Sequence, residues 1–137
     1  MSGASPAQPW WRRWFGMRSE HAAEKHLKGM GYKIVARNYK CPFGELDLVA
    51  VDGECVVFVE VRSTEAEDAL KPAESVGAKK QDTLTKLAID FLTKHRLLGK
   101  NVRFDVLAVS WPADERSPAI NHYRNAFDAS DRIQALF

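Results

Sequence analysis

The sequence has little of what marks secreted, metal-cluster or membrane proteins. Its 137 residues contain only two cysteines, Cys41 and Cys55, and such a pair makes neither a disulfide framework nor the closely spaced pairs of zinc and CxxC redox sites. The apolar runs are far shorter than the roughly 20 residues that span a membrane, and the first residues lack the continuous apolar segment of a signal peptide. We therefore expect reduced cysteines, no membrane partner and a cytoplasmic location.

Net charge is also small, which limits the class of partner. There are 20 Lys and Arg residues and 18 Asp and Glu residues, so the formal net charge is +2. This gives only weak support for a polyanionic partner, and a nucleic-acid site would have to be a local patch. The four histidines show no metal-ligand spacing, and the chain has no repeats or low-complexity tracts. Its length fits one domain with a single core.

The most informative segment is residues 44–62, GELDLVAVDGECVVFVEVR, which reads as a β-hairpin. Runs rich in Val, Leu and Phe flank Asp52 and Gly53, and an Asp-Gly pair is a strong signal for a two-residue turn. A turn there pairs Val51 with Glu54, Asp47 with Phe58, and Glu45 with Glu60. Because side chains alternate between the faces of a strand, one face is expected to carry Glu45, Asp47, Val49, Val56, Phe58, Glu60 and Arg62.

This face places carboxylates close together on an otherwise apolar hairpin. Asp47 and Glu60 become diagonal neighbours, roughly 7–8 Å apart at the backbone, and like charges so close destabilise a hairpin unless something neutralises them. An oxygen-preferring divalent cation would do so. The alternative is a merely solvated face, but residues 55–61 are apolar on both faces apart from Glu60, as in an interior strand. A β-bulge would shift the parity and remove the inference.

The other elements surround this hairpin. Residues 63–78 show no periodicity and read as a loop, a candidate mobile flap over a substrate. The order of the elements predicts an α/β fold with an αβββαβ core, in which a mixed central sheet is flanked by helices. The patterns indicate helices over residues 17–30 and 79–98, strands over 32–39 and 102–109, and a weaker strand-like element over 119–127.

Charged residues on the two predicted helices are candidates for the same acidic face. Glu20 and Glu24 are one helical turn apart, so both can point toward the sheet edge or toward solvent. Lys80 lies four residues before Leu84, at the start of the apolar stripe of the second helix. Its ammonium group could reach the carboxylates of the hairpin, or it could extend to water while its stem packs on the core.

The chain divides into three expected parts. Residues 1–15 form a flexible aromatic and basic arm, residues 16–128 form one domain, and residues 129–137 form a C-terminal tail. The arm contains Arg12 and Arg13 but no acidic residue, which suits stacking on nucleic acid or steering it. Disorder, or packing against a neighbouring subunit, are the alternatives.

Several of these residues also resemble a known family. Glu on the first helix, Asp on the second strand and Glu-x-Lys on the third characterise the PD-(D/E)XK nuclease superfamily, the restriction-endonuclease-like fold. More narrowly, the chain resembles the YraN-like family of predicted endonucleases, which are distantly similar to archaeal Holliday junction resolvases. The matching segments span residues 16–128 and are Gly16-x-x-x-Glu20, Ala23-x-x-x-Leu27-x-x-x-Gly31-Tyr32, Ala36-Arg37-Asn38-Tyr39, Gly44-Glu45-Leu46-Asp47-Leu48, Val57-Phe58-Val59-Glu60-Val61-Arg62, Ser75-Val76 with Lys80-Gln81, Arg103-Phe104-Asp105-Val106 and Asn125-Ala126-Phe127.

The resemblance implies a metal-dependent endonuclease that hydrolyses DNA phosphodiester bonds, with branched or damaged DNA among the expected substrates. It implies Asp47 and Glu60 as ligands of Mg²⁺ or Mn²⁺, with Glu20 orienting a water at the metal or completing a second metal site. Lys80 would position or help deprotonate the attacking water. Arg62 would neutralise charge on the scissile phosphate.

Further roles follow from the same resemblance. Glu45 would be an outer-shell partner of the metal site, or simply a solvated residue at the start of its strand. Arg37, Lys40 and Arg103 are candidates for phosphate contacts. Resolvases act on two symmetric strands, so a homodimer is expected by analogy.

Arg62 departs from the superfamily pattern, which has lysine at this position. Arginine stays protonated, so it can stabilise a developing charge but cannot accept a proton from water, whereas lysine can shift its pKa when buried. Lys80 is the best substitute. The alternative function is a catalytically inactive nucleic-acid-binding or assembly module on a nuclease fold. A third reading, a structural domain without nucleic-acid contacts, fits the small net charge but leaves the acidic face unexplained.

Overall fold

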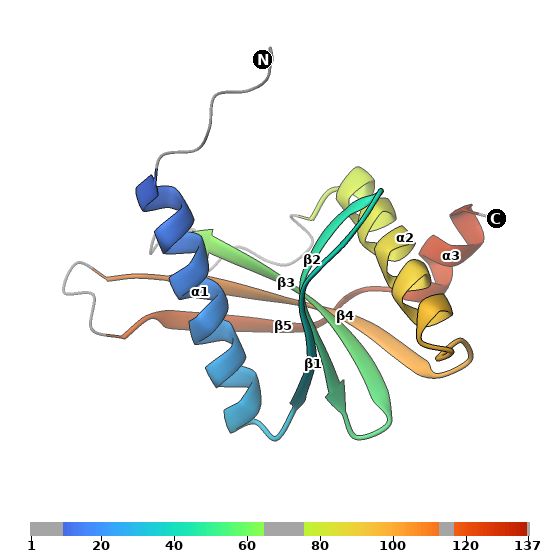
Figure 1. The fold of residues 1–137 in the computed structure, drawn as a ribbon, viewed down its shortest axis with the longest axis horizontal. Coiled ribbons are helices and arrows are strands. Elements are labelled where there is room, and N and C mark those ends of the chain that lie inside the picture. The colour runs from blue at the N-terminus through green and yellow to red at the C-terminus, as the bar shows by residue number, and fades with distance from the viewer. Residues whose placement is uncertain (1–9, 65–75, 113–116, 137) are drawn as a thin grey trace, which may run out of the picture.

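The computed structural model describes residues 10–64, 76–112 and 117–136 (Figure 1). The helices and strands occur in the order α1 (Trp10–Gly29), β1 (Lys33–Cys41), β2 (Gly44–Asp52), β3 (Cys55–Thr64), α2 (Ala78–Lys94), β4 (Asn101–Ser110), β5 (Ala119–Phe127) and α3 (Ala129–Leu136). None of the helices in these ranges is long and apolar enough to cross a membrane.

The strands form one sheet in the order β1-β2-β3-β4-β5. Strands β3 and β4 run parallel and are connected through α2, while every other neighbouring pair is antiparallel. A parallel pair requires a crossover, and an intervening helix is the usual one. The predicted α/β class, αβββαβ order and mixed central sheet are therefore confirmed, and they are consistent with a restriction-endonuclease-like core.

Helices cover both faces of the sheet and close two apolar cores (Figure 1). On one face, Ala23 and Leu27 of α1 pack on the sheet. On the other face, α2 contributes the buried stripe that its periodicity predicts, consisting of Leu84, Leu87, Ala88, Phe91 and Leu92. Burial of such a stripe at helical spacing is what stabilises a helix of this length in a small domain.

Helix α2 ends earlier than its sequence pattern predicts. The helix stops at Lys94, and the backbone N–H of His95 donates to Phe91 O as the cap. Arg96 then takes a left-handed φ of 56°, which an α-helix cannot continue. The predicted end at residue 98 was wrong because Leu98, although apolar, is 63% exposed.

The hairpin of β2 and β3 turns one residue later than predicted, which shifts the cross-strand partner of each residue by two. Asp52 pairs with Cys55, so the turn residues are Gly53 and Glu54 rather than Asp52 and Gly53. Gly53 has a φ of 62°, a backbone conformation that glycine adopts without steric cost. The predicted register was therefore wrong by two residues. A shift by two preserves the faces, and Val49, Val56 and Phe58 all lie in the core beneath α2 as predicted.

Both ends of the described chain are more helical than predicted. Helix α1 begins at Trp10 rather than at residue 17. Residues 129–136, predicted as a tail, form α3, and Arg132 Nη1 lies 3.0 Å from Asp82 Oδ1 of α2. Residues 1–9 of the predicted arm and residues 65–75 of the predicted flap lie outside the described residues.

Candidate functional site

Strands β2 and β3 separate at the position of the predicted carboxylates. Their backbone pairing ends at Leu48 and Val59, whereas β3 stays paired with β4 as far as Thr64. Just beyond the separation, the backbone N–H of Val61 donates to Asp47 Oδ2 at 2.8 Å. A side-chain carboxylate has taken the place of a strand carbonyl, and this bond fixes Asp47 beside Glu60.

The proximity of these carboxylates changes the proton affinity of Asp47. The pKa of Asp47 is raised from its ordinary 3.8 to about 7, and burial is the largest cause. The bond from Val61 N–H lowers this pKa, whereas the negative charges of Glu60 and Glu20 contribute to raising it. A carboxyl group with a pKa near neutrality can exchange its proton for a cation under ordinary conditions.

Lys80 reaches the same site from α2. Its Nζ lies 3.3 Å from Glu60 Oε2, and the two side chains are 43% and 13% exposed. Lys80 is in the first turn of α2, at the start of the buried stripe, so the helix directs it toward β3 as the sequence suggested. Arg62 follows Glu60 by two positions on β3 and is half-buried, which places it on the same face by strand alternation.

Asn38 joins two further glutamates to the site, although no role was predicted for it. With its amide nitrogen turned toward them, Asn38 donates to Glu20 Oε1 at 3.0 Å and to Glu45 Oε1 at 3.1 Å. Its φ is 50°, the left-handed region that asparagine tolerates better than other non-glycine residues. The signals in the sequence were an asparagine inside a predicted strand and its place in the matching segment Ala36-Arg37-Asn38-Tyr39.

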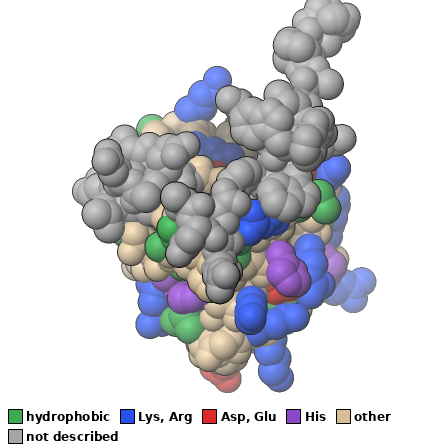
Figure 2. Space-filling model, turned by 90° about the vertical axis from the view of Figure 1, so that its left-hand side faces the viewer, with side chains coloured by type: hydrophobic (Ala, Val, Ile, Leu, Met, Phe, Trp, Pro, Cys, Tyr) green, Lys and Arg blue, Asp and Glu red, His purple; other side chains and the backbone are tan. Residues whose placement is uncertain are grey.

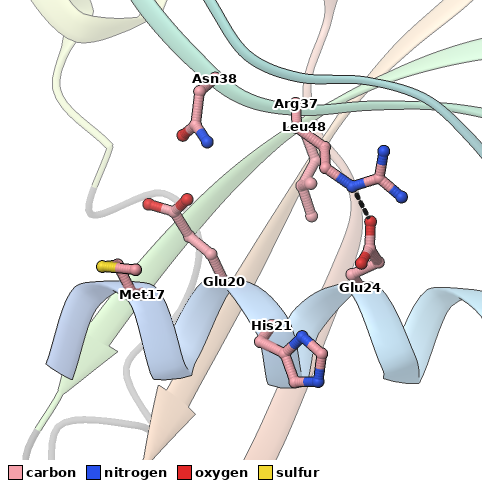
Figure 3. Close-up of a pocket in the computed structure, with 7 residues that line it drawn as sticks. All are labelled: Met17, Glu20, His21, Glu24, Arg37, Asn38 and Leu48. Carbon is pink, nitrogen blue, oxygen red and sulfur yellow. Dashed lines mark hydrogen bonds and ion pairs between the residues drawn. The ribbon is translucent and has the colours of Figure 1, made fainter. Parts of the chain in front are cut away.

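Glu20 lines a hollow between α1 and the start of the sheet. Figure 3 shows Glu20 and Asn38 pointing toward each other across it, with Glu24 and Arg37 joined beside them. The hollow has a volume of about 180 Å³. The pKa of Glu20 is raised, first by burial and then by the charges of Glu45 and Glu60. Glu20 therefore belongs electrostatically to the same acidic group as Glu60.

The structure gathers most of the predicted site but not all of it. It brings together Asp47, Glu60, Lys80 and Glu20, and links Glu45 through Asn38. The predicted phosphate contacts are all engaged in ion pairs. Arg37 pairs with Glu24 beside the hollow that Glu20 lines, and Lys40 Nζ lies 3.9 Å from Glu45 Oε2. Arg103 pairs instead with Asp105 and Asp52, at 2.9 and 3.0 Å.

Arg103 differs from the other two cations because it is largely buried. Its side chain is 13% exposed, and it donates to Asp105, Asp52 and the hydroxyl of Tyr32. His122 Nε2 lies 2.7 Å from Asp105 Oδ2 on the same carboxylate. Arg103 is thus the centre of a polar network beneath the C-terminal half of α1.

The donor set fits a hard divalent cation that takes few ligands from protein. Within the described ranges, no group of three His, Cys, Asp or Glu side chains is arranged to hold a metal ion. Asp47 and Glu60 offer carboxylate oxygens at one point, and Mg²⁺ typically takes one or two carboxylates while water and phosphate oxygens supply the rest. The excess of negative charge around Asp47 is the condition that such a cation would relieve.

Comparison with known proteins assigns the chain to a family. The model of the "Uncharacterised protein family UPF0102" matches residues 19–109, a range that contains Glu20, Asp47, Glu60 and Lys80. A UPF0102 protein of Moorella thermoacetica is 41% identical over 116 residues, which are 85% of this chain and 97% of that protein. A UPF0102 protein of Myxococcus xanthus is 38% identical over 129 residues, covering 94% of this chain and 98% of that one.

One solved structure is distantly similar. It is SfsA of Pyrococcus furiosus in complex with Ca²⁺, with a TM-score of 0.37 and 16% sequence identity, covering 82% of this chain and 63% of that chain. The sequence matches are far stronger than this likeness. They show that the chain belongs to the uncharacterised protein family UPF0102.

Proposed function

We propose that this protein is a metal-dependent endonuclease that hydrolyses DNA phosphodiester bonds, with branched or damaged DNA among its substrates. One observation carries the proposal: Asp47, Glu60 and Lys80 meet where β2 and β3 separate, with Glu20 facing them from α1. Carboxylates beside a lysine, where two neighbouring strands separate, suit hydrolysis of a phosphodiester better than a purely structural role, which would not require clustered like charges.

Asp47 and Glu60 are the residues that would hold Mg²⁺ or Mn²⁺. A bound cation of this kind supplies Lewis-acid polarisation of the phosphate and lowers the pKa of water. Asp47 is held in place for this by Val61 N–H, and Glu60 is held by Lys80. Both donors are therefore ordered before a cation arrives, which reduces the entropic cost of binding it.

The remaining residues handle protons and charge. In this proposal Lys80 positions the attacking water or helps to deprotonate it, and Glu20 orients that water from the α1 side. Arg62 remains protonated throughout and neutralises charge on the scissile phosphate, but it cannot act as a base. Glu45 would act only through Asn38, as an outer-shell partner that fixes Glu20.

A second function is favoured by one specific residue. Arg62 occupies the position where the PD-(D/E)XK superfamily, which the chain resembles, has lysine. This difference favours a catalytically inactive nucleic-acid-binding or assembly module on a nuclease fold. Such a module would bind DNA or a protein without needing a metal ion. A homodimer is proposed for either function, by analogy with enzymes that cleave two symmetric strands.

A cleavage assay on a labelled panel separates the two functions. Single-stranded, duplex, flap and four-way-junction DNA are incubated with Mg²⁺ or Mn²⁺ and with wild type, Asp47→Asn or Glu60→Gln. Lys86→Gln is the control, because Lys86 is an exposed cation on α2. The nuclease account expects cleavage by wild type and Lys86→Gln, and loss of cleavage with retained DNA affinity in both carboxylate variants. Metal-independent binding of the panel without cleavage by wild type would favour the binding module instead.

A further inference from the structure

A second hollow lies on the other flank of α1 from Glu20. On a helix, Arg18 and Ala22 point about 160–200° away from Glu20, and both line this hollow together with Trp111 and Pro118. Its volume is about 580 Å³. Met17 and His21, on the outer side of the helix, line both hollows. The two hollows are therefore neighbours, separated by the exposed ridge of α1.

Arg18 and Trp111, which both line this hollow, form a cation–π pair. Arg18 Cζ lies 3.9 Å from the centroid of the Trp111 ring. The indole Nε1–H donates to Ser19 Oγ at 3.0 Å, and Ser63 Oγ donates to the same oxygen at 2.6 Å. Ser19 is fully buried, so these bonds fix the orientation of the indole. The indole ring is therefore fixed in orientation, and the planar guanidinium group of Arg18 lies over it.

The hydroxyl chain also ties this pair to the candidate active site. Ser19 precedes Glu20 in α1, and Ser63 follows Glu60 by three residues in β3. Through these hydroxyl groups, the Arg18–Trp111 pair is hydrogen-bonded to α1, which carries Glu20, and to β3, which carries Glu60. A ligand held in this hollow would contact the same helix that carries Glu20.

The charge of the hollow is basic. Arg18, His21 and Lys25 line it, and no carboxylate is among its lining residues in the described ranges. Figure 2 shows Lys and Arg side chains gathered near a histidine on this side of the molecule. A planar stacking surface beside cations is the combination that binds unpaired bases and their phosphates, since every base has a π-face and every nucleotide a negative charge.

We propose that this hollow binds an unpaired nucleobase of single-stranded DNA, stacked on the Arg18–Trp111 pair, with Lys25 contacting the adjacent phosphate. The inference rests on the proposed function and deepens it, because it gives the nuclease a preference for substrates that carry a single-stranded segment next to the cleaved bond. In fully paired DNA, no base is free to stack on this surface. Flaps, gaps and opened junctions contain unpaired bases that can do so.

A pair of matched oligonucleotides tests the stacking directly. Binding of a fluorescent 12-mer of thymidine is compared with binding of the same 12-mer carrying abasic residues, in EDTA and at fixed salt, so that the phosphate charge is equal and no cleavage occurs. Wild type is expected to bind the thymidine strand about ten-fold or more tightly than the abasic one. Equal affinity for the two strands would overturn the proposal, because charge attraction alone cannot tell them apart.

Variants assign the preference to the named residues. Arg18→Lys keeps the charge but loses the planar group, and Trp111→Leu keeps apolar bulk against the core beneath α1. Both are expected to lower the base preference to about two-fold or less, while Lys86→Gln leaves it unchanged. If Trp111→Leu does not fold, as judged by circular dichroism, Arg18→Lys decides alone. A preference that survives Arg18→Lys would overturn the proposal.

Failure of this inference is distinguishable from failure of the proposed function. Cleavage that depends on Asp47, combined with no base preference, would overturn the stacking site and leave the nuclease standing. A base preference that depends on Arg18, combined with no cleavage in any metal, would support the stacking site on a binding module.

Discussion

Lys80 Nζ lies 3.3 Å from Glu60 Oε2, so helix α2 delivers an ammonium group to the carboxylate of strand β3. Among the residues that the structure describes, this contact is a direct ion pair between the crossover helix and the acidic group. It also places at the site a lysine that compensates for Arg62 in the proposed chemistry, since a lysine side chain can give up its proton and an arginine side chain cannot.

Lys80→Met should therefore lower single-turnover cleavage by about 100-fold or more, the usual range for loss of a general acid or base. Lys80→Arg should not restore it, because the positive charge returns without an exchangeable proton. Stability should change by only about 1 kcal/mol or less in either variant, since the pair is partly exposed. Lys86→Met is the matched control. Full activity in Lys80→Arg would show that charge alone is required.

Asp47 should make the folded state lose stability as pH rises from about 4 to about 7. Its pKa is 3.8 ordinarily and about 7 in the fold, first because of burial. Between these values the folded state keeps a proton that the unfolded chain has released, so the contribution is fully present below pH 4 and lost by pH 7. The loss is on the order of 3 kcal/mol or less. Urea titrations in EDTA at several pH values measure it.

Asp47→Asn isolates this effect from other titrating groups. The amide mimics the protonated carboxyl and its oxygen can still accept from Val61 N–H. The stability of wild type relative to Asp47→Asn should fall as pH rises across this window, and Mg²⁺ should reverse the fall at pH 8 for wild type alone by binding the folded state. Parallel stability curves for the two proteins would show that Asp47 does not titrate there.

Asn38 should contribute to activity through its amide rather than through its backbone. Asn38→Gly keeps the left-handed backbone at no steric cost but removes the donor to Glu20 and Glu45. We expect this variant to cleave about ten-fold more slowly because Glu20 is no longer held. Asn38→Ala should behave the same in cleavage but lose about 1–2 kcal/mol of stability in addition. Wild-type cleavage by Asn38→Gly would remove Asn38 from the site.

Asp105 should be a stability residue and not part of the site. Burial pushes its pKa up, but hydrogen bonds with His122, Arg103 and the backbone N–H of Asn125 more than offset this, so its pKa lies below the ordinary value. Asp105→Ala leaves Arg103 buried without its main partner and should cost about 3–5 kcal/mol in urea denaturation. Asp52→Ala, at the more exposed end of the same network, should cost about 1 kcal/mol. Equal losses in both variants would contradict this ranking.

The sequence predicted the parts of this structure that local periodicity controls. Strand alternation placed Asp47 and Glu60 on one face, and helical spacing placed Lys80 toward them. The turn was misplaced because Asp-Gly and Gly-Glu both offer a glycine, and only the pairing of Asp52 with Cys55 decides between them. Because the register differed from the prediction by an even number of residues, Val49, Val56 and Phe58 still lie on one face of the sheet, as predicted.

What the sequence could not predict depends on contacts between distant residues. Nothing local to Asn38 indicates that it will meet Glu20, eighteen positions earlier on another element. The same holds for Ser19 and Trp111, whose bond joins α1 to the end of β4. Helix α1 also extends to Trp10, ahead of the apolar periodicity on which the predicted start at residue 17 depended.

A change of metal specificity at Asp47 tests most directly whether Asp47 binds the cation that cleavage requires. Asp47→Cys replaces a hard oxygen donor with a thiolate, which binds Mg²⁺ poorly and softer ions well. If Asp47 holds the cation, Asp47→Cys fails to cleave DNA in Mg²⁺ and regains cleavage in Cd²⁺, while Lys80→Met is restored by neither ion. Cleavage by Asp47→Cys in Mg²⁺ at the wild-type rate would contradict the claim that Asp47 holds the cation.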